Sequence, residues 1–136
     1  MDALAAKAAS RHGMRFYVLG ATPEMNARAI ERIHIMYPYL RLAGARDGYF
    51  DRDKICHVAD EIAATRPDIL WIGVGNPEQL LLAHVFKQLI PSLTWVRTCG
   101  GLFDFLSGQR SRAPAAMQAA GLEWAYRMAL EPRRLG

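Results

Sequence analysis

The stretch PDILWIGVGNPEQ, residues 67–79, decides the fold class. Its segment 68–73 is continuously apolar after the first residue, which predicts a strand covered by helices on both faces. Glycines close this strand, and Pro77 opens a helix that we expect to reach about Gln88. A buried strand that leads directly into a helix is the repeating unit of a parallel α/β sheet.

The same alternation continues in both directions from this stretch. We expect further strands at 14–19, 40–44 and 93–99, and helices near the N-terminus, at about 23–37, at about 51–65 and from 113 onward with a break near residue 121. With right-handed crossovers, this order predicts an α/β, Rossmann-like three-layer sandwich with a mostly parallel sheet of about four strands. We expect residues 1–108 to form the Rossmann-like half-domain and residues 109–136 a basic helical appendage.

The composition is that of an ordinary soluble domain. With 51% apolar residues, the 136-residue chain can bury a core without disulfides or metals. No apolar run approaches the roughly 20 residues that cross a bilayer, and the N-terminus does not resemble a signal peptide, so we expect a cytoplasmic protein. Cys56 and Cys99 are predicted to be reduced, buried thiols. The four histidines are scattered, which predicts no metal site.

Positive charge gathers at the C-terminal end. Residues 109–136 hold five arginines (Arg110, Arg112, Arg127, Arg133, Arg134) against two glutamates, a balance of +3 out of a net charge of +4. Such a tail can face the phosphates of nucleic acid, lipid head groups or a diphosphate substrate, or simply solvent. Because the basic residues are not interleaved with exposed aromatic residues, we do not expect nucleic acid as a partner.

Glycines follow three of the predicted strands, at Gly20, at Gly73 and Gly75, and at Gly100 and Gly101. Ligands of parallel sheets bind beyond the carboxyl ends of the strands, where glycine lets a ligand approach the backbone. The alternative is that these glycines only make tight strand-to-helix turns. Three such loops at one edge favour a nucleotide-like ligand, although the complete G-x-G-x-x-G pattern is absent.

Five blocks of the sequence resemble one known family. They are LGATPEMNARAIERI, YPYLRLAGARDGYF, PDILWIGVGNPEQ, CGGLFDFLSGQRSRAP and GLEWAYRMALEPRRL, in this order. They are similar to the C-terminal portion of the WecG/TagA/CpsF glycosyltransferases (glycosyltransferase family 26), and the resemblance covers about residues 2–135. It implies an inverting transfer of a sugar from a UDP-sugar to a polyprenyl-diphosphate-linked sugar, for teichoic acid, common antigen, capsule or exopolysaccharide, without a metal or other cofactor.

The resemblance also assigns residues to two half-sites. The donor pocket would be lined by Gly20, Thr22, Tyr49, Gly75, Gln79, Gly100 and Gly101, with backbone N–H groups around the diphosphate. Tyr49 would stack on or border the nucleotide; the equal alternative is that Tyr49 and Phe50 form a hydrophobic staple for the next helix. The acceptor diphosphate would be bound by Arg112, Arg127, Arg133 and Arg134. Leu122, Trp124 and Tyr126 would meet the bilayer interface or the core, which implies a peripheral position at the inner face of the cell membrane.

The chain departs from the family pattern in two ways. The family domain begins well before residue 1, so we expect a fragment or a naturally short form that lacks the aspartate proposed as catalytic base. Asp104 is then the candidate carboxylate, the alternative being a structural acceptor of hydrogen bonds from helix N–H groups or from Arg110 or Arg112. In the second departure, the family's G-x-P-x-Q-E block ends in Leu80 here instead of an acid.

Two functional hypotheses follow from the sequence. The first is a UDP-sugar-dependent glycosyltransferase of cell-surface polysaccharide synthesis. The second is a non-catalytic Rossmann-like module that binds a nucleotide or is a remnant of the enzyme. In either case a half-domain leaves a sheet edge exposed, and we expect a partner there, with a homo-oligomer as one form.

Overall fold

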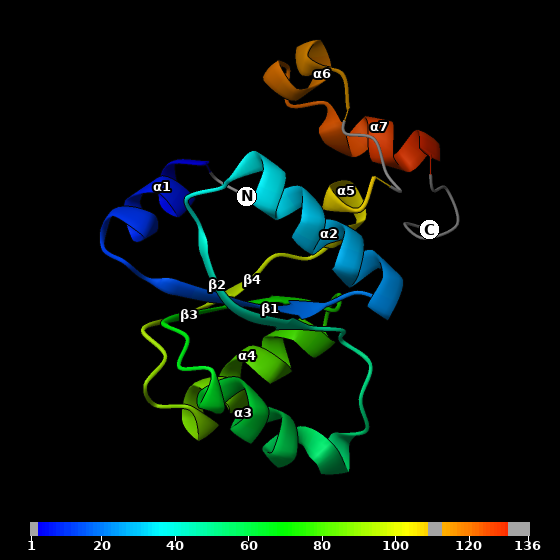
Figure 1. Cartoon of the computed structure of the whole chain (residues 1–136). Helices are drawn as coiled ribbons and strands as arrows, with labels where there is room; N and C mark the ends of the chain where they lie inside the picture. The colour runs from blue at the N-terminus through cyan, green and yellow to red at the C-terminus, as the bar shows by residue number, and fades with distance from the viewer. Residues whose placement is uncertain (1–2, 109–112, 131–136) are drawn as a thin grey trace.

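A computed structural model describes residues 3–108 and 113–130, and it places four parallel strands between two layers of helices (Figure 1). The strands are β1 (Arg15–Gly20), β2 (Arg41–Arg46), β3 (Ile69–Gly73) and β4 (Trp95–Thr98), and their order in the sheet is β2-β1-β3-β4. The predicted α/β class is confirmed, and the described sheet is entirely parallel.

The helices begin and end close to the predicted positions. They are α1 (Ala3–Arg11), α2 (Pro23–Met36), α3 (Ile55–Ala64, preceded by a 3₁₀ turn at Arg52–Lys54), α4 (Glu78–Leu89), α5 (Leu102–Leu106), α6 (Ala115–Ala119) and α7 (Glu123–Leu130). Thr22 caps α2, because its hydroxyl accepts the N–H of Met25 at 3.3 Å. Pro23 follows at the first helical position, where it removes no helical hydrogen bond.

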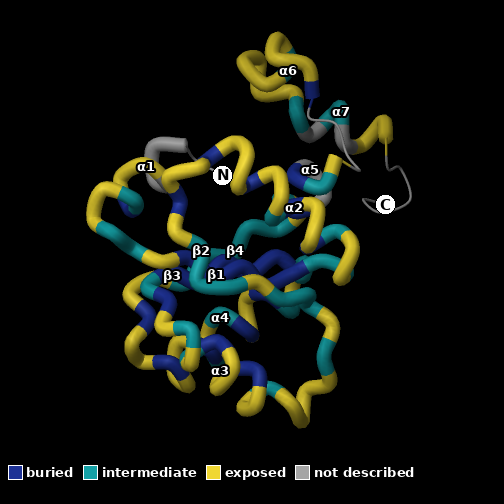
Figure 2. Tube along the Cα trace, in the orientation of Figure 1, coloured by how far each residue is buried: buried dark blue, intermediate teal, exposed yellow. Residues whose placement is uncertain are grey.

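The sheet separates two hydrophobic cores. On the first face, called the α2 face, Phe16, Val18 and Trp71 pack with residues of α1, α2 and α5. On the second face, called the α3 face, Leu19 and Ile72 pack with residues of α3 and α4. Because both faces are covered, every residue of β3 is buried (Figure 2), as its continuous apolar sequence predicts.

Two features differ from the sequence-based expectations. The short helix α5 was not predicted, because five residues are too few to show a helical period. Cys56 was predicted to be buried and is exposed, because it lies on the side of α3 that faces solvent; Cys99 is partly buried. The predicted boundary between residues 108 and 109 falls where the described residues are interrupted and stays a prediction.

Phe103 of α5 packs against the ends of β1 and β3, and this contact explains two glycines. The Phe103 side chain is 2% exposed. A Cβ on Gly73 would overlap the Phe103 ring, and a Cβ on Gly20 would overlap the Gly73 carbonyl and lie 2.9 Å from the same ring. Close packing therefore requires glycine at the ends of both central strands, whatever binds beyond them.

We predict that Gly73→Ala destabilises the protein by about 1–3 kcal/mol, because its methyl group would displace the Phe103 ring. In a Phe103→Leu background the same substitution should have less than half that effect, since the smaller side chain leaves room. Urea denaturation of the wild type, both single variants and the double variant measures the coupling. Equal effects of Gly73→Ala in both backgrounds would contradict the proposed contact.

Candidate functional site

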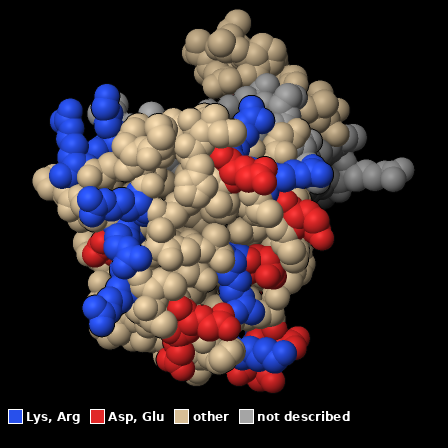
Figure 3. All heavy atoms as spheres, viewed as in Figure 1, with Lys and Arg blue, Asp and Glu red and all other residues tan. Residues whose placement is uncertain are grey.

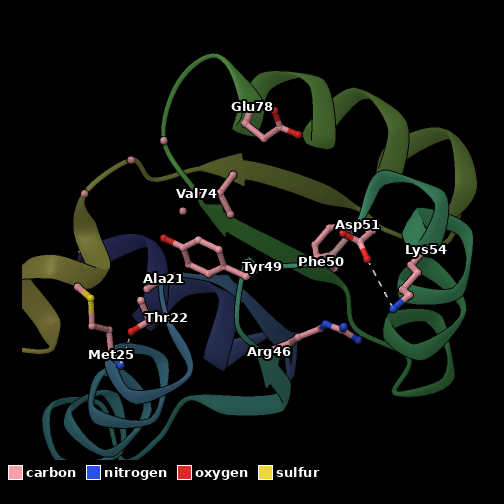
Figure 4. A pocket seen from close by; sticks show the side chains of 15 residues that line it. Ala21, Thr22, Met25, Arg46, Tyr49, Phe50, Asp51, Lys54, Val74 and Glu78 are labelled. Carbon is pink, nitrogen blue, oxygen red and sulfur yellow. Dashed lines mark hydrogen bonds and ion pairs between the residues drawn. The ribbon is translucent and has the colours of Figure 1, made fainter.

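The loops that follow the four strands enclose a pocket of about 790 Å³ at the carboxyl edge of the sheet (Figure 4). Its volume is in the range of small-molecule sites, and its position is where parallel sheets bind ligands. It is lined by Ala21, Thr22, Met25, Arg46, Gly48, Tyr49, Phe50, Asp51, Lys54, Gly73, Val74, Gly75, Glu78, Gly100 and Gly101.

Five of the seven predicted donor residues line this pocket: Thr22, Tyr49, Gly75, Gly100 and Gly101. The other two, Gly20 and Gln79, are buried behind the lining. The structure thus brings the predicted residues together at one edge, although their contact with a donor stays a prediction.

Tyr49 and Phe50 have different environments. Phe50 packs into the core of the α3 face, and its ring centre lies 6.4 Å from that of Phe86. Tyr49 is 70% exposed, and Figure 4 shows its ring in the pocket between Val74 and Ala21. The turn before it is held by Asp47, whose carboxylate accepts the Tyr49 N–H at 2.9 Å. Phe50 anchors the segment, and Tyr49 is left available to a planar ligand.

A buried asparagine connects the ends of β1 and β2. The Asn26 side chain amide donates to the carbonyl of Gly20 at 2.9 Å and to the carbonyl of Arg46 at 2.8 Å. Asn26 lies on the buried stripe of α2 with Ala29 and Ile33, so the helix positions it against the sheet. Both strand-end carbonyls are therefore satisfied without water, and the two loops are held together.

A buried glutamine does the same for the loops after β3 and β4. Gln79 is 5% exposed, its Oε1 accepts the N–H of Gly100 at 3.0 Å, and its Nε2 donates to Asn76 Oδ1 at 2.7 Å. It lies on the buried stripe of α4 with Leu82 and Phe86. Gln79 was predicted to contact the donor directly; in this structure both ends of its amide are used to position the lining.

Two glycines of the pocket, Gly75 and Gly100, have free space where a side chain would be. Their φ angles are +91° and +52°, and a Cβ at either position would meet nothing within 4 Å. The φ values favour glycine, while the empty space means that packing alone does not require it. Within residues 3–108 and 113–130, the N–H groups of Gly75 and Gly101 donate no hydrogen bond. These two N–H groups can therefore bind an anion.

Charged side chains form one end of the pocket. The Arg46 guanidinium pairs with Glu61 and lies 5.6 Å from the centre of the Phe50 ring, and its buried Nε has no partner among the described residues. Lys54 lies 3.7 Å from Asp51. On the face of the molecule seen in Figure 3, Lys and Arg side chains are interspersed with Asp and Glu side chains. An exposed ion pair such as Lys54–Asp51 contributes little to stability. The Lys54 ammonium can therefore leave Asp51 and bind an anionic ligand.

The predicted acceptor residues fall largely outside the described part of the structure. Arg112, Arg133 and Arg134 lie outside the described residues, as does Arg110. Asp104 and Arg127 belong to α5 and α7, but their side chains are not among those described. Their predicted roles stay predictions.

Asn26, Arg46, Gly48 and Lys54 were not predicted as site residues. The sequence did indicate a buried role for Asn26. A single amide side chain on an otherwise apolar stripe of a helix must find hydrogen-bond partners in the protein interior. Gly48 is required because a Cβ there would overlap the Val74 side chain and lie 3.1 Å from Gly20 Cα. Arg46 ends a strand, as the predicted glycines do, but its sequence neighbours do not reveal that it faces the pocket.

Neither a metal-binding cluster nor a membrane-spanning helix is found in the described part of the chain. There, no three His, Cys, Asp or Glu side chains come close enough together to hold a metal ion. No described helix combines the length and the apolar character needed to cross a bilayer.

Comparison with known proteins gives a consistent result. The sequence matches the family described as "Glycosyl transferase WecG/TagA/CpsF family" over residues 1–136. Two relatives are each named N-acetylglucosaminyldiphosphoundecaprenol N-acetyl-beta-D-mannosaminyltransferase. The Bacillus spizizenii (strain W23) protein is 37% identical over 120 residues, which are 88% of this chain and 46% of the relative. The Bacillus subtilis (strain 168) protein is 33% identical over 126 residues, 93% and 48% of the two chains. The chain therefore spans about half the length of these curated relatives.

We predict that Gln79→Met destabilises the protein by about 1–3 kcal/mol, because the Gly100 N–H and the Asn76 oxygen lose their partner. The matched control is Gln88→Met on the same helix, where the side chain is exposed; its effect should stay within about 0.5 kcal/mol. Urea denaturation measures both, and hydrogen exchange should show a faster Gly100 amide in Gln79→Met alone. Equal losses in the two variants would refute the positioning role.

Cys99 gives a pH prediction. Burial raises the pKa of its thiol to about 12, and the Sγ donates to the Ile72 carbonyl at 3.3 Å. Because the thiolate is the reactive form, iodoacetamide at pH 9 should modify the exposed Cys56 in the native protein and reach Cys99 only after unfolding. Mass spectrometry of the digested protein identifies the modified residue, and rapid native labelling of Cys99 would contradict its burial.

The same shift makes stability depend on pH. The folded-state pKa of Cys99 lies above the unfolded value of about 8.5, so its stabilisation is complete below pH 8.5 and is lost as the pH rises toward 12. Between pH 8.5 and 10, the free energy of unfolding should therefore fall more steeply in the wild type than in Cys99→Ala.

Proposed function

This chain belongs to the WecG/TagA/CpsF glycosyl transferase family, and on that premise we propose that its pocket is the donor half-site of a sugar transferase. The donor is a UDP-sugar, the acceptor is a sugar carried on a polyprenyl diphosphate, and the product is a precursor of cell-surface polysaccharide. The observation that carries the proposal is the pocket itself, whose lining combines the exposed ring of Tyr49 with two strand-end residues, Gly75 and Gly101, whose N–H groups donate no hydrogen bond within the described residues. The acceptor class follows the names of the two relatives, both of which contain N-acetylglucosaminyldiphosphoundecaprenol.

The proposed donor pose uses the two ends of the pocket differently. The uracil ring stacks on Tyr49, whose exposed face offers an apolar surface that tolerates a planar base. The diphosphate lies over the loops after β3 and β4, where the N–H groups of Gly75 and Gly101 face it. Lys54, at the charged end, can approach the phosphate oxygens when it leaves Asp51.

The transfer step requires groups beyond this pocket. A carboxylate accepts the proton of the acceptor hydroxyl, the hydroxyl oxygen attacks the anomeric carbon with inversion, and UDP leaves with its charge stabilised by N–H groups and cations. Asp104 is the candidate base within this chain, and the alternative is an aspartate in the half of the transferase that this chain does not span. Arg112, Arg127, Arg133 and Arg134 bind the acceptor diphosphate, which holds the C-terminal helices at the inner membrane face.

We predict that the purified chain binds UDP saturably and more tightly than uridine, and that Tyr49→Ala raises the Kd for both. Loss of one base–aromatic stack corresponds to about 1–3 kcal/mol, or roughly 5- to 150-fold in Kd. Isothermal titration calorimetry measures all of these affinities.

Tyr39→Ala is the matched control. Tyr39 is also an exposed tyrosine, but it precedes β2 and therefore lies at the amino end of that strand, away from the carboxyl ends that bear the pocket. Its Kd for UDP should equal that of the wild type. Absence of UDP binding, or equal Kd values for Tyr49→Ala and wild type, would reject the donor half-site. UDP binding without transfer to a polyprenyl-diphosphate-linked sugar would instead leave the chain as a nucleotide-binding module.

A further inference from the structure

In the part of the chain that the structure describes, β4 is an edge strand whose outer side is unpaired. Its one neighbour in the described sheet is β3. The N–H groups of Trp95 and Cys99 donate toward β3, to the carbonyls of Asp68 at 3.2 Å and Ile72 at 2.8 Å. Because the direction alternates along a parallel strand, the N–H and C=O groups of Val96 and Thr98 point to the outer side.

The two edges of the sheet differ in regularity. At the other edge, the register between β1 and β2 shifts after Phe16, and Ala43 is the extra residue on β2. Such a bulge, with Arg41 and Arg46 at the strand ends, disfavours the addition of another strand. The register of β4 with β3 is uninterrupted from Trp95 to Thr98. Of the two edges, β4 is the one whose geometry suits a further strand.

The α2 face of β4 is incompletely covered. Trp95 is 44% exposed, and the Arg97 guanidinium carbon lies 5.6 Å from the centre of its ring. Beside them is a hollow of about 230 Å³, lined by Trp71, Arg97, Thr98, Cys99 and Leu102. Trp71 is 2% exposed, and its indole N–H has no partner among the described residues. An indole N–H and a guanidinium both donate, so the hollow suits a carbonyl or carboxylate oxygen.

The handedness of the crossovers shows which strand would fit. Helix α2 lies on the same face as α1 and leads from β1 outward to β2 (Figure 1). Because parallel crossovers are right-handed, a parallel strand that leads through α1 into β1 must lie on the opposite side of β1 from β2. β3 and β4 already occupy that side, so the next vacant position is the outer edge of β4.

We propose that the outer edge of β4 receives a parallel strand from the half of the transferase that precedes α1 in the longer relatives. This chain spans 46% and 48% of two relatives, so about half of each remains to supply such a strand. The resemblance places this chain in the C-terminal portion of the family domain, which puts the remaining half before α1. The added strand pairs with Val96 and Thr98, and a carbonyl or carboxylate oxygen from that half accepts the Trp71 indole N–H.

The test pairs the full 136-residue chain with the half of a relative that this chain does not span. The probe is the part of the Bacillus spizizenii relative that this chain does not match, co-expressed as a separate polypeptide and, in a second experiment, fused before Met1. In both, two-dimensional NMR should show the Val96 and Thr98 amides exchanging about tenfold or more slowly than in the chain alone. The Trp71 indole N–H signal should shift, and the Leu42 amide at the other edge should not change.

Val96→Pro and Val96→Thr form a matched pair for the same measurements. The proline removes an N–H that faces outward, so the β3–β4 ladder and the fold remain, whereas the threonine keeps the N–H. In Val96→Pro, the slow amide exchange of Thr98 should be lost, and the co-expressed polypeptide should no longer co-purify with the chain. Val96→Thr should keep both properties. The readouts are independent of nucleotide binding, so a failed donor half-site would not affect them.

Three results would overturn the proposal. The first is unchanged exchange of Val96 and Thr98 in both the co-expressed and the fused forms. The second is equal behaviour of Val96→Pro and Val96→Thr. The third is a dimer of the chain alone in which these two amides are already protected, since β4 would then pair with a second copy.

Discussion

Two buried side-chain amides hold the carboxyl edge of this sheet in one shape, and the pocket depends on them. A strand that ends in a loop leaves backbone groups that water would otherwise satisfy. Asn26 satisfies the carbonyls that end β1 and β2, and Gln79 satisfies the Gly100 N–H after β4 while holding Asn76 after β3. Each amide comes from the buried stripe of a helix, so the loops are positioned by rigid elements. A pocket held in this way loses little conformational entropy when a ligand binds.

The glycines at this edge serve two different purposes. Gly73 is required by the Phe103 ring, Gly20 by the Gly73 carbonyl as well as that ring, and Gly48 by the Val74 side chain, so these three are packing residues. Gly75 and Gly100 have positive φ angles and open space, which suits the approach of a ligand to the backbone. Of the two alternatives considered from the sequence, a purely structural role accounts for Gly20 and Gly73, and ligand approach stays a prediction for Gly75 and Gly100.

Structural features set by interactions between residues close in sequence were predictable, and features set by contacts between residues far apart in sequence were not. The four strands and the long helices were predictable because apolar periodicity is local and strong in segments such as 69–73. The edge that bears the pocket was predictable because parallel strands bring their ends together. The amide of Gln79 was assigned to the ligand instead of to the loops, because its partner Gly100 is 21 residues away and sequence gives no distance. The short helix α5 and the role of Arg46 depend on tertiary contacts in the same way.

The pocket and the outer edge of β4 are parts of one continuous segment, and this has a mechanical consequence. Thr98 ends the edge strand, Cys99 donates its N–H to Ile72, and Gly100, which Gln79 holds, lines the pocket. A strand paired with Thr98 would restrict the same segment whose position sets the anion-binding loop. Strand pairing and donor binding would then each order this segment. Whichever happens second loses less conformational entropy than it would alone, so the two events reinforce each other. If both proposals hold, donor binding and association of the two halves must strengthen each other by the same factor.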